Sequence, residues 1–426
     1  MALVKVEEGT PAHRAIQLAG YAAFLGIALW LPYIANPAHP LRIGKAVFQI
    51  GLFNRVLVYV VAIMAVNLVT GFTGQISIGH GAFVGVGAYA SAILIASWHW
   101  GYAATIPVAI LLGFVVGVVI GIPALRIRGL YLAIVTTAVA VAFPTLVLKF
   151  GSFTGGVNGK KPCWRGGRTG TKLICPKIVP PGWGRALFGL KAGDQPRWTY
   201  FILLFLAIAC AVLVRNLVRS RVGRAMIAIR DRETAAAVSG INTRVYKVIT
   251  FGVSGAIAAV AGVMYLMQGQ FISDVDFSFS FSLFIIVGIV AGGIASQSGP
   301  WMGALLIILV PHVTGAFVGT SPRPHLSVHQ LVPISKYYLF KQPTVLFGVL
   351  LLILVFLMPY GVADGMRRLR ARLLTVTPHP SWLEEAKERA ATHRADAPAI
   401  VTAAAGPTDD EHPLVPVPDH NHGGTT

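Results

Sequence analysis

Long apolar runs recur ten times along this chain of 426 residues, and they restrict its fold more than any other feature. A run of about 20 apolar residues can cross a bilayer as a helix, which satisfies its own backbone inside lipid. Only 12% of the residues are charged, against about 25% in an average soluble domain. The sequence therefore predicts an all-α, polytopic integral membrane protein. Its roughly ten transmembrane helices are expected near residues 15–35, 46–69, 74–97, 103–122, 129–150, 199–216, 248–268, 281–297, 300–319 and 341–359.

Basic residues predict the orientation of these spans. Residues 1–372 carry 32 basic and 8 acidic residues, whereas residues 373–426 carry 3 and 8. Short loops rich in Lys and Arg face the cytoplasm, so we place the basic loops after the sixth and tenth spans there and expect no nucleic-acid partner. The predicted organisation is a cytoplasmic N-terminus at 1–14, a transmembrane domain at 15–360 and a largely disordered cytoplasmic tail at 361–426. The first span is expected to be an uncleaved anchor.

Residues 150–198 form an extended loop that this scheme places outside the cell. The loop holds nine basic residues and one acid, Asp194, but long loops can cross a membrane despite their charge. It also contains Cys163 and Cys175, while Cys210 lies in a span. A disulfide between the two loop cysteines would suit an oxidising compartment such as the bacterial periplasm, and two unpaired thiols remain the alternative.

Three further patterns indicate whether the chain binds nucleotide or metal and whether it couples transport to an ion. The stretch "SFTGGVNGKK" resembles a phosphate-binding loop, but Thr154 and Lys161 occupy the positions of its first glycine and its hydroxyl residue. Tail histidines 412, 420 and 422 are more typical of a solvated segment than of a metal site. The predicted spans contain no acidic residue, whereas ion-coupled carriers usually bury a carboxylate. We therefore expect this chain to bind no metal or nucleotide and to draw energy from elsewhere.

The stretch "NLVTGFTGQISIGHGAFVGVGAYASAIL", residues 67–94, places glycines and polar side chains inside an apolar run. Glycine permits unusual backbone dihedrals, and unwound backbone in a membrane is tolerated only where it meets protein or water. We predict a break that lines a path for solute; the alternative is that its polar groups satisfy neighbouring helices. A second break is expected at Gly292, Gly293, Gly299 and Gly303, with Pro300. The candidate path residues are Gly74, Gln75, Ser77, Gly79, His80, Tyr131 and Thr136.

Residues 217–247 form the predicted cytoplasmic loop, within which "RDRETAAAVSGINTR" indicates a short helix. Asp231 suits its N-cap, Glu233 the positive end of its dipole and Gly240 a left-handed end. Upstream, an apolar face is predicted at Val222, Met226 and Ile229. Such a helix can insert into a groove of a partner protein or lie on anionic lipid, and the residues leave both open.

The same loop, "RAMIAIRDRETAAAVSGIN", resembles the Glu-Ala-Ala loop with which permeases of ABC importers dock onto their ATPase subunits. Here Thr234 stands at the glutamate position and Val253 where a later proline would be. These departures are typical of the branched-chain amino acid transporter permease family. Three more stretches are similar to its LivM-type subunit. They are "NLVTGFTGQISIGHGAFVGVGAY", "RGLYLAIVTTAVA" with "FTGGVNG", and "SFSFSLFIIVGIVAGGIASQSGPWMGALL".

This resemblance implies a non-catalytic permease subunit in a bacterial inner membrane, importing branched-chain amino acids or related small polar solutes. It implies a second permease subunit in a heterodimer, two ABC ATPase subunits that bind ATP and Mg, and a periplasmic solute-binding protein. A stand-alone secondary carrier or channel is the alternative, and a non-transporting scaffold is a third. The implied coupling residues are Arg224, Arg230, Asp231, Glu233, Ala235, Ala236 and Gly240.

Overall fold

The computed structural model describes residues 4–7, 11–35, 41–43, 46–124, 130–166, 172–191, 193–318, 348–349, 352–353, 356–358 and 361–377. The chain divides into two compact units. One is Ala19–Arg372, and the other joins Met1–Leu18 to Leu373–Thr426. In the latter, strand β1 (Val4–Glu7) pairs in parallel with β6 (Leu374–Thr377). The tail histidines fall outside the described residues.

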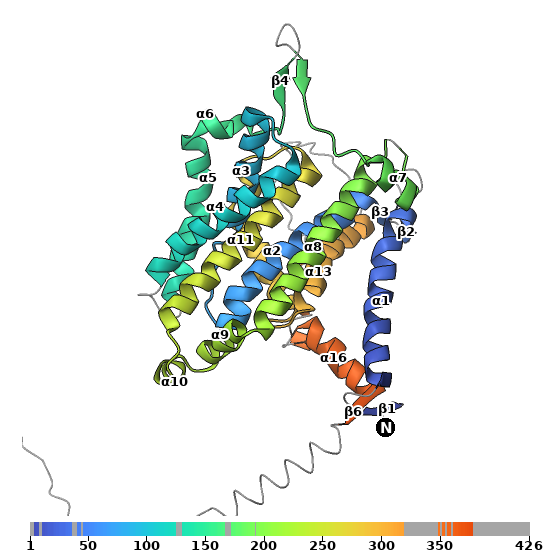
Figure 1. Ribbon diagram of the computed structural model, residues 1–426, viewed down its shortest axis with the longest axis vertical. Helices are drawn as coiled ribbons and strands as arrows, with labels where there is room; N and C mark the ends of the chain where they lie inside the picture. The colour runs from blue at the N-terminus through green and yellow to red at the C-terminus, as the bar shows by residue number, and fades with distance from the viewer. Residues whose placement is uncertain are drawn as a thin grey trace, which may run out of the picture. The chain divides into compact units, whose positions relative to one another are not determined.

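Helices make up almost all of the larger unit (Figure 1). The long helices are α1 (Pro11–Ile34), α2 (Ile50–Val66), α3 (His80–Trp98), α4 (Tyr102–Ala124), α5 (Leu130–Lys149), α8 (Gln195–Arg219), α11 (Thr243–Gly269), α12 (Phe279–Gly292) and α13 (Gly299–Val318). The shorter ones are η1 (Asn67–Gly71), α6 (Gly151–Thr154), η2 (Gly156–Asn158), α7 (Gly182–Phe188), α9 (Arg221–Asp231), α10 (Glu233–Val238), η3 (Val275–Phe277) and α16 (Val362–Leu373). Two hairpins pair β2 (Leu41–Ile43) with β3 (Ala46–Phe48) and β4 (Trp164–Gly166) with β5 (Lys172–Ile174).

Seven helices among the described residues are long and apolar enough to cross a membrane, so the chain is a multi-pass membrane protein. Two shorter apolar helices, Ala22–Ile34 and Gly299–Gly315, stand where spans were expected at 15–35 and 300–319. The span expected at 341–359 lies largely outside the described residues. The seven spans are Ile50–Gly71, His80–Trp98, Tyr102–Pro123, Tyr131–Lys149, Gln195–Arg219, Thr243–Gly269 and Val275–Gly292.

One expectation about acids is wrong at the edge of a span. The last of the seven starts at Val275, so Asp276 falls within its first turn. The Asp276 carboxylate accepts hydrogen bonds from the amide and the hydroxyl of Ser273, at 2.7 and 3.0 Å. The carboxylate therefore stabilises the turn that precedes the helix, and the other six spans contain no acid.

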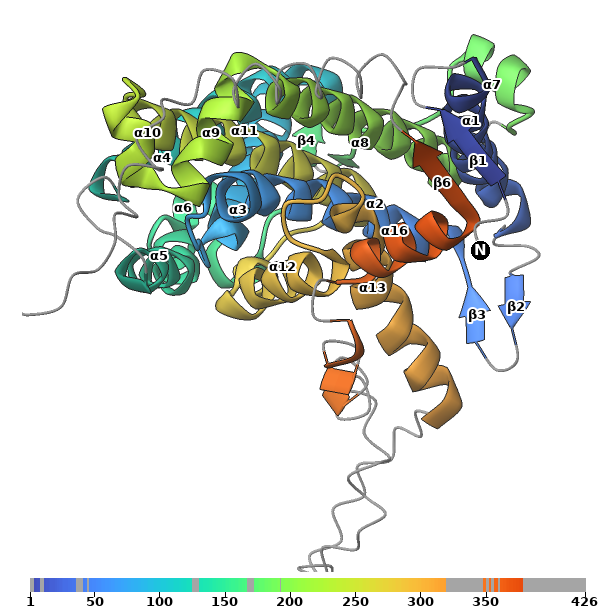
Figure 2. The ribbon, with the colours of Figure 1, turned by 90° about the horizontal axis from the view of Figure 1, so that it is seen from below.

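Helices α2, α3 and α11 form the centre of the bundle. Helix α11 packs against α2, α3 and α4, and α2 lies between α8 on one side and α12 with α13 on the other (Figure 2). Most of α2 and α11 is buried, 78% and 72% of an 18-residue apolar stretch in each span, against 28% for the same length of α4 and α5. The outer helices expose large apolar side chains such as Leu111, Val119 and Phe205. Exposed apolar side chains on a polytopic bundle fit contact with lipid.

Small residues let these helices approach one another closely, as packing in lipid requires. A Cβ atom on Gly113 of α4 would lie 2.5 Å from the carbonyl oxygen of Gly255 in α11. Gly85 of α3 likewise leaves room for the rings of Phe143 and Phe277. Close approach of backbones at glycine therefore contributes to the centre of the bundle, beside buried large side chains such as Phe83 and Phe251.

The two long loops lie at opposite ends of the bundle (Figure 1). Residues 150–198 carry α6, the β4–β5 hairpin and α7 at one end, and α9 and α10 lie at the other. A disulfide joins Cys163 to Cys175 beside the β4–β5 pair, with their Cα atoms 4.2 Å apart. Lys160 forms a two-hydrogen-bond bridge to Ile272, at 2.8 and 3.0 Å, which ties this loop to the segment before α12.

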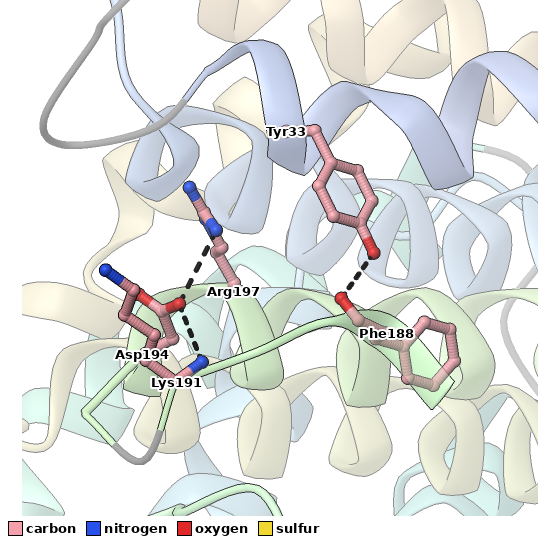
Figure 3. A network of polar contacts seen from close by, with 5 residues as sticks. All are labelled: Tyr33, Phe188, Lys191, Asp194 and Arg197. Atoms are coloured by element: carbon pink, nitrogen blue, oxygen red, sulfur yellow. Dashed lines mark hydrogen bonds and ion pairs between the residues drawn. The ribbon is translucent and has the colours of Figure 1, made fainter. Parts of the chain in front are cut away.

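Helix α1 is attached to the bundle through polar contacts around the start of α8 (Figure 3). The Tyr33 hydroxyl donates to the carbonyl of Phe188 at 2.7 Å. Asp194 accepts from the Lys191 amide at 3.2 Å and from Arg197 at 3.5 Å. The Arg197 guanidinium also lies 6.0 Å from the ring centroid of Tyr33, within the range of a cation–π contact. The single acid of the long loop therefore orients the arginine that holds α1.

The α4–α11 contact predicts a clear stability effect. Gly113→Val should lower the free energy of unfolding by at least about 1–3 kcal/mol, because the new side chain overlaps the α11 backbone. The thermal unfolding midpoint in detergent measures this. Gly51→Val, in the first turn of α2 with open space among the described residues, is the matched control. Equal midpoints for the two variants would contradict the close packing.

Candidate translocation segment and coupling loop

The predicted break between α2 and α3 is present. Helix α2 passes into the π-helix η1 at Asn67, and residues 74–79 have no regular secondary structure before α3 begins at His80. Gly74 adopts a φ of +72°, a conformation that other residues rarely tolerate. Isolated π turns are often found at functional sites. We call residues 67–79 the first break.

The last carbonyl groups of a helix have no partner within the helix, and in a membrane they must find one elsewhere. At the first break, local donors and one distant arginine supply them. The acceptor and donor pairs are Asn67 O with Phe72 N, Leu68 O with Thr73 Oγ1 (3.0 Å), Val69 O with Gln75 N (3.1 Å) and Gly71 O with Arg230 Nη1 (3.2 Å). The break is therefore a satisfied structure and not an unfolded gap.

The start of α3 is satisfied by side chains from two other helices. The Ile78 amide donates to Thr136 Oγ1 of α5 at 3.0 Å, and the Gly81 amide donates to Ser282 Oγ of α12 at 3.0 Å. A Cβ on Gly79 would lie 2.6 Å from the carbonyl oxygen of Thr136, so this position has room only for glycine. Two hydroxyls thus replace the missing previous turn of the helix.

His80 lies in a buried chain of hydrogen bonds that joins three segments. Ser254 Oγ of α11 donates to the Ala65 carbonyl of α2 at 2.6 Å. The same oxygen lies 2.6 Å from His80 Nε2, and Ser77 Oγ lies 3.0 Å from His80 Nδ1. Because the one Ser254 proton goes to Ala65, Nε2 carries the imidazole proton and Nδ1 accepts from Ser77. His80 therefore connects the first break to α2 and α11.

Gln75 differs from its polar neighbours. Its side chain is only 7% exposed, yet neither amide atom has a hydrogen-bond partner among the described residues. An unpaired buried amide is costly and calls for an explanation, such as a bound molecule. Gly74 and Ile76 on either side are exposed. The side-chain amide of Gln75 thus keeps its full hydrogen-bonding capacity as far as the described residues show.

The structure brings most of the predicted path residues together. Ser77, Gly79, His80 and Thr136 form one buried cluster through the contacts above, and Gly74 with Gln75 lies directly before it. Tyr131 does not join them, since 71% of its side chain is exposed on α5. A role of any of these residues in conducting solute remains a prediction.

The second predicted break is also present, between the end of α12 at Gly292 and the start of α13 at Gly299. Asn67, which the sequence did not single out, joins it to the first break. Asn67 Nδ2 donates to Ser296 O at 2.8 Å, and the Ala295 amide donates to Asn67 Oδ1 at 3.0 Å. The signal available in the sequence was an amide inside an apolar run, directly before the glycines.

The 217–247 loop is anchored by apolar side chains from one of its two helices. Ser220 caps α9, with its hydroxyl accepting from the Gly223 amide at 3.5 Å. Met226 and Ile229 are 0% and 4% exposed, which confirms the apolar face, and Val222 packs against the same core. Helix α9 therefore belongs to the bundle.

The caps of the second helix differ in part from expectation. Arg232, and not Asp231, is the N-cap residue of α10; Asp231 ends α9, where its carboxylate binds Arg230 at 2.9 Å. The N-cap assignment was wrong because the two helices are almost continuous. Glu233 binds Lys247 of α11 at 2.6 Å. Gly240 has a φ of +83°, which confirms the left-handed end.

The outer surface of α10 is exposed. Val238 is 90% exposed, and Ala235 is exposed beside it, whereas Ala236 is buried at 4%. Arg224 is exposed on α9 and donates to the Arg219 carbonyl at 3.2 Å. The loop therefore presents a small apolar tip on a rigidly held base.

Fold and sites together define a multi-pass membrane protein with two glycine-rich breaks in its bundle. Residues 49–359 match the family model described as "Branched-chain amino acid transport system / permease component", and the chain belongs to this family. No solved structure matches it.

Relatives with curated names agree with this family. The chain is 30% identical over 283 residues to the high-affinity branched-chain amino acid transport permease LivM of Escherichia coli, covering 64% of each chain. Its identity to LivH of the same organism is 30% over 151 residues, 35% of this chain and 46% of LivH. It is 23% identical to a probable LivM of Methanocaldococcus jannaschii over 73% of this chain and 80% of that one. The chain thus spans about two thirds of the bacterial LivM length it matches.

The His80 chain predicts a graded loss of stability. His80→Ala removes two hydrogen bonds and leaves a cavity between α2, α3 and α11, so it should lower the free energy of unfolding by about 2–4 kcal/mol. Ser77→Ala removes one hydrogen bond and should cost about 1 kcal/mol or less. Unfolding by SDS in mixed micelles measures both values. A His80→Ala variant as stable as the wild type would disprove the network.

Proposed function

We propose that this chain is a membrane-spanning permease subunit of an ABC importer. It translocates branched-chain amino acids or related small polar solutes, and ATP hydrolysis in partner subunits drives it. It performs no covalent chemistry and holds no cofactor itself; ATP and Mg bind to the partners. The family supports the class, and the names of the relatives support the solute.

The observation that carries this proposal is the form of the coupling loop, residues 217–247. Met226 and Ile229 fix α9 in the bundle, and the Glu233–Lys247 ion pair fixes α10 to α11. A loop that only set topology would need neither anchor. The exposed Ala235 and Val238 next to Gly240 supply the kind of short apolar helix face that inserts into a groove of a partner. We assign that groove to the ATPase subunits.

The first break supports a solute path. Its backbone is satisfied by protein groups, as unwound chain in a membrane must be, and Gln75 adds an amide with free hydrogen-bonding capacity. A small polar solute offers matching donors and acceptors. We propose that the path runs along the first break, between this subunit and a second, similar permease in a heterodimer.

The loop at 150–198 supports the orientation. It lies at the end of the bundle opposite α9 and α10 and carries the Cys163–Cys175 disulfide. Disulfides persist in oxidising compartments, so we place this end in the periplasm and the coupling loop in the cytoplasm of a bacterial inner membrane. A periplasmic solute-binding protein would deliver solute to this end.

Gly240 provides the test of coupling. A β-branched side chain is strained at a φ of +83°, although the site has open space among the described residues. In the purified complex, Gly240→Val should keep membrane insertion and ATP hydrolysis but lower solute uptake per ATP by about tenfold or more. Gly189→Val is the matched control, because Gly189 has a φ of +59° and open space among the described residues but follows directly after α7, at the opposite end of the bundle.

Three outcomes, from this experiment and from work on the wild-type chain, would contradict parts of the proposal. Solute uptake by Gly240→Val at the wild-type level would contradict the docking role of the coupling loop. A tagged wild-type chain that purifies without ATPase subunits, yet moves solute into liposomes without ATP, would favour a stand-alone carrier or channel. Partner binding without any solute flux would favour a scaffold.

Gln75 gives a second test with an unusual combination of effects. Gln75→Leu removes an amide that has no partner among the described residues, so the folded chain should be no less stable. Solute uptake at subsaturating concentration should nevertheless fall about tenfold, because a hydrogen bond to the solute is lost. Gln75→Asn keeps the amide and should retain part of the uptake. Full uptake by Gln75→Leu would remove Gln75 from the path.

A further inference from the structure

Arg230 is the one residue of the 217–247 loop seen to donate a hydrogen bond to the first break, as far as the described residues show. Its Nη1 atom donates to the Gly71 carbonyl at 3.2 Å. Its aliphatic stem lies against Gly74, where an added Cβ would be 3.0 Å from Arg230 Cγ. Arg230 therefore contacts the first break at two points, Gly71 and Gly74.

The sequence of α9 explains why Arg230 has this position. Met226 lies four residues earlier, on the same face, and is fully buried. Asp231 then fixes the far edge of the guanidinium, accepting from Nε at 3.0 Å and from Nη2 at 2.9 Å. The side chain is thus held by its own helix on one side and by the break on the other. A cation at the carboxyl end of a helix such as η1 is also favoured by the helix dipole.

Gly71, which accepts the hydrogen bond from Arg230, also contacts the second break. Gly71 packs on Asn67 and on the Ala295 backbone, because a Cβ on Gly71 would overlap Asn67 Oδ1 and lie 2.7 Å from the Ala295 amide nitrogen. Asn67 in turn holds Ala295 and Ser296 by the two hydrogen bonds given above. Ala295 has a φ of +58°, a strained conformation for a residue with a side chain. Such strain persists only where surrounding contacts hold it.

A third segment meets the same turn. Gly361, directly before α16, has a φ of +81°, and a Cβ there would lie 2.5 Å from the Gly293 Cα. The second break is therefore held from two sides, by Asn67 from within the bundle and by the chain that leads into α16. The second break cannot shift without moving one of these contacts.

We propose that Asp231, Arg230, Gly71, Asn67 and the Ala295–Ser296 turn form a relay, with Arg230 as its positioning residue. The relay makes the two breaks move together with the coupling loop. When α9 and α10 move, Arg230 carries the Gly71 carbonyl with it, and Gly71 moves Asn67 and the strained turn. This inference rests on the proposed function, since it requires a partner that moves the loop.

The test compares variants of the assembled complex, purified from membranes with its ATPase subunits. Arg230→Met keeps the apolar stem over Gly74 but removes the donor to Gly71. We expect it to copurify with the ATPases and to hydrolyse ATP, while solute uptake per ATP falls about tenfold. Arg230→Lys restores one donor and a charge, so it should recover part of that ratio. Arg221→Met, an exposed arginine at the other end of α9, is the matched control.

Asn67 provides the second arm. Asn67→Ala should also lower uptake per ATP, and the double variant with Arg230→Met should be no worse than the more affected single variant, because both act in one chain. Multiplied effects in the double variant would overturn the relay. Size-exclusion profiles show whether Asn67→Ala folds; if it does not, the Arg230 comparison still decides.

The failures of the two proposals differ in this experiment. An Arg230→Met complex with the same uptake per ATP as Arg221→Met would overturn the relay and leave the importer assignment intact. A wild-type chain that neither copurifies with ATPases nor responds to ATP would overturn the importer assignment, and with it the relay. Lost copurification in Arg230→Met alone would show that the arginine serves docking, which also overturns the relay.

Discussion

The need to satisfy every backbone group inside a bilayer is the constraint on which this structure depends. A helix meets it alone, but the first break between α2 and α3 cannot. Thr73, Thr136 and Ser282 supply hydroxyls in place of the missing turns, and Arg230 reaches the last carbonyl from another helix. Polar residues inside an apolar stretch are the unusual feature of the first break in the sequence. Together with their partners they satisfy the backbone groups that lose helical partners when the chain unwinds.

This use of polar groups limits what the proposed path could recognise. Ser77, His80 and Thr136 have their hydrogen-bonding capacity taken up by the protein, so within the described part of the first break Gln75 keeps a free amide. A path with few free polar groups distinguishes solutes weakly, since specificity comes from hydrogen bonds that a wrong ligand leaves unmade. Strong solute selection would then lie in the protein that delivers the solute, in keeping with the proposed importer.

The parts of the fold that sequence predicts are those with local causes. Apolar run length marks the spans, and glycines mark both breaks, with Pro300 beside the second, because each pattern acts within a few residues. The hydrogen-bond partners of the polar side chains could not be predicted from the sequence. Asn67 binds residues 228 and 229 positions away, and His80 binds Ser254, which is 174 positions away. Asp231 shows the same limit at short range, because α9 continues through Asp231, which therefore binds Arg230 instead of capping α10. Residue type indicates that a group needs a partner, and only tertiary packing decides which one.

The contact between the first and second breaks consists of backbone groups, glycine and the side-chain amide of Asn67. This composition suits the movement that the proposed relay requires. The Asn67 side chain presents one donor and one acceptor to Ala295 and Ser296, as a neighbouring peptide group would. Large apolar side chains in its place would interlock and resist sliding, since close-packed interiors have few intermediate arrangements. The two hydrogen bonds of Asn67 hold the Ala295–Ser296 turn to the first break, so in the proposed relay the two breaks move together. In the importer proposed above, which would alternate between two states, this contact would let both breaks change position together.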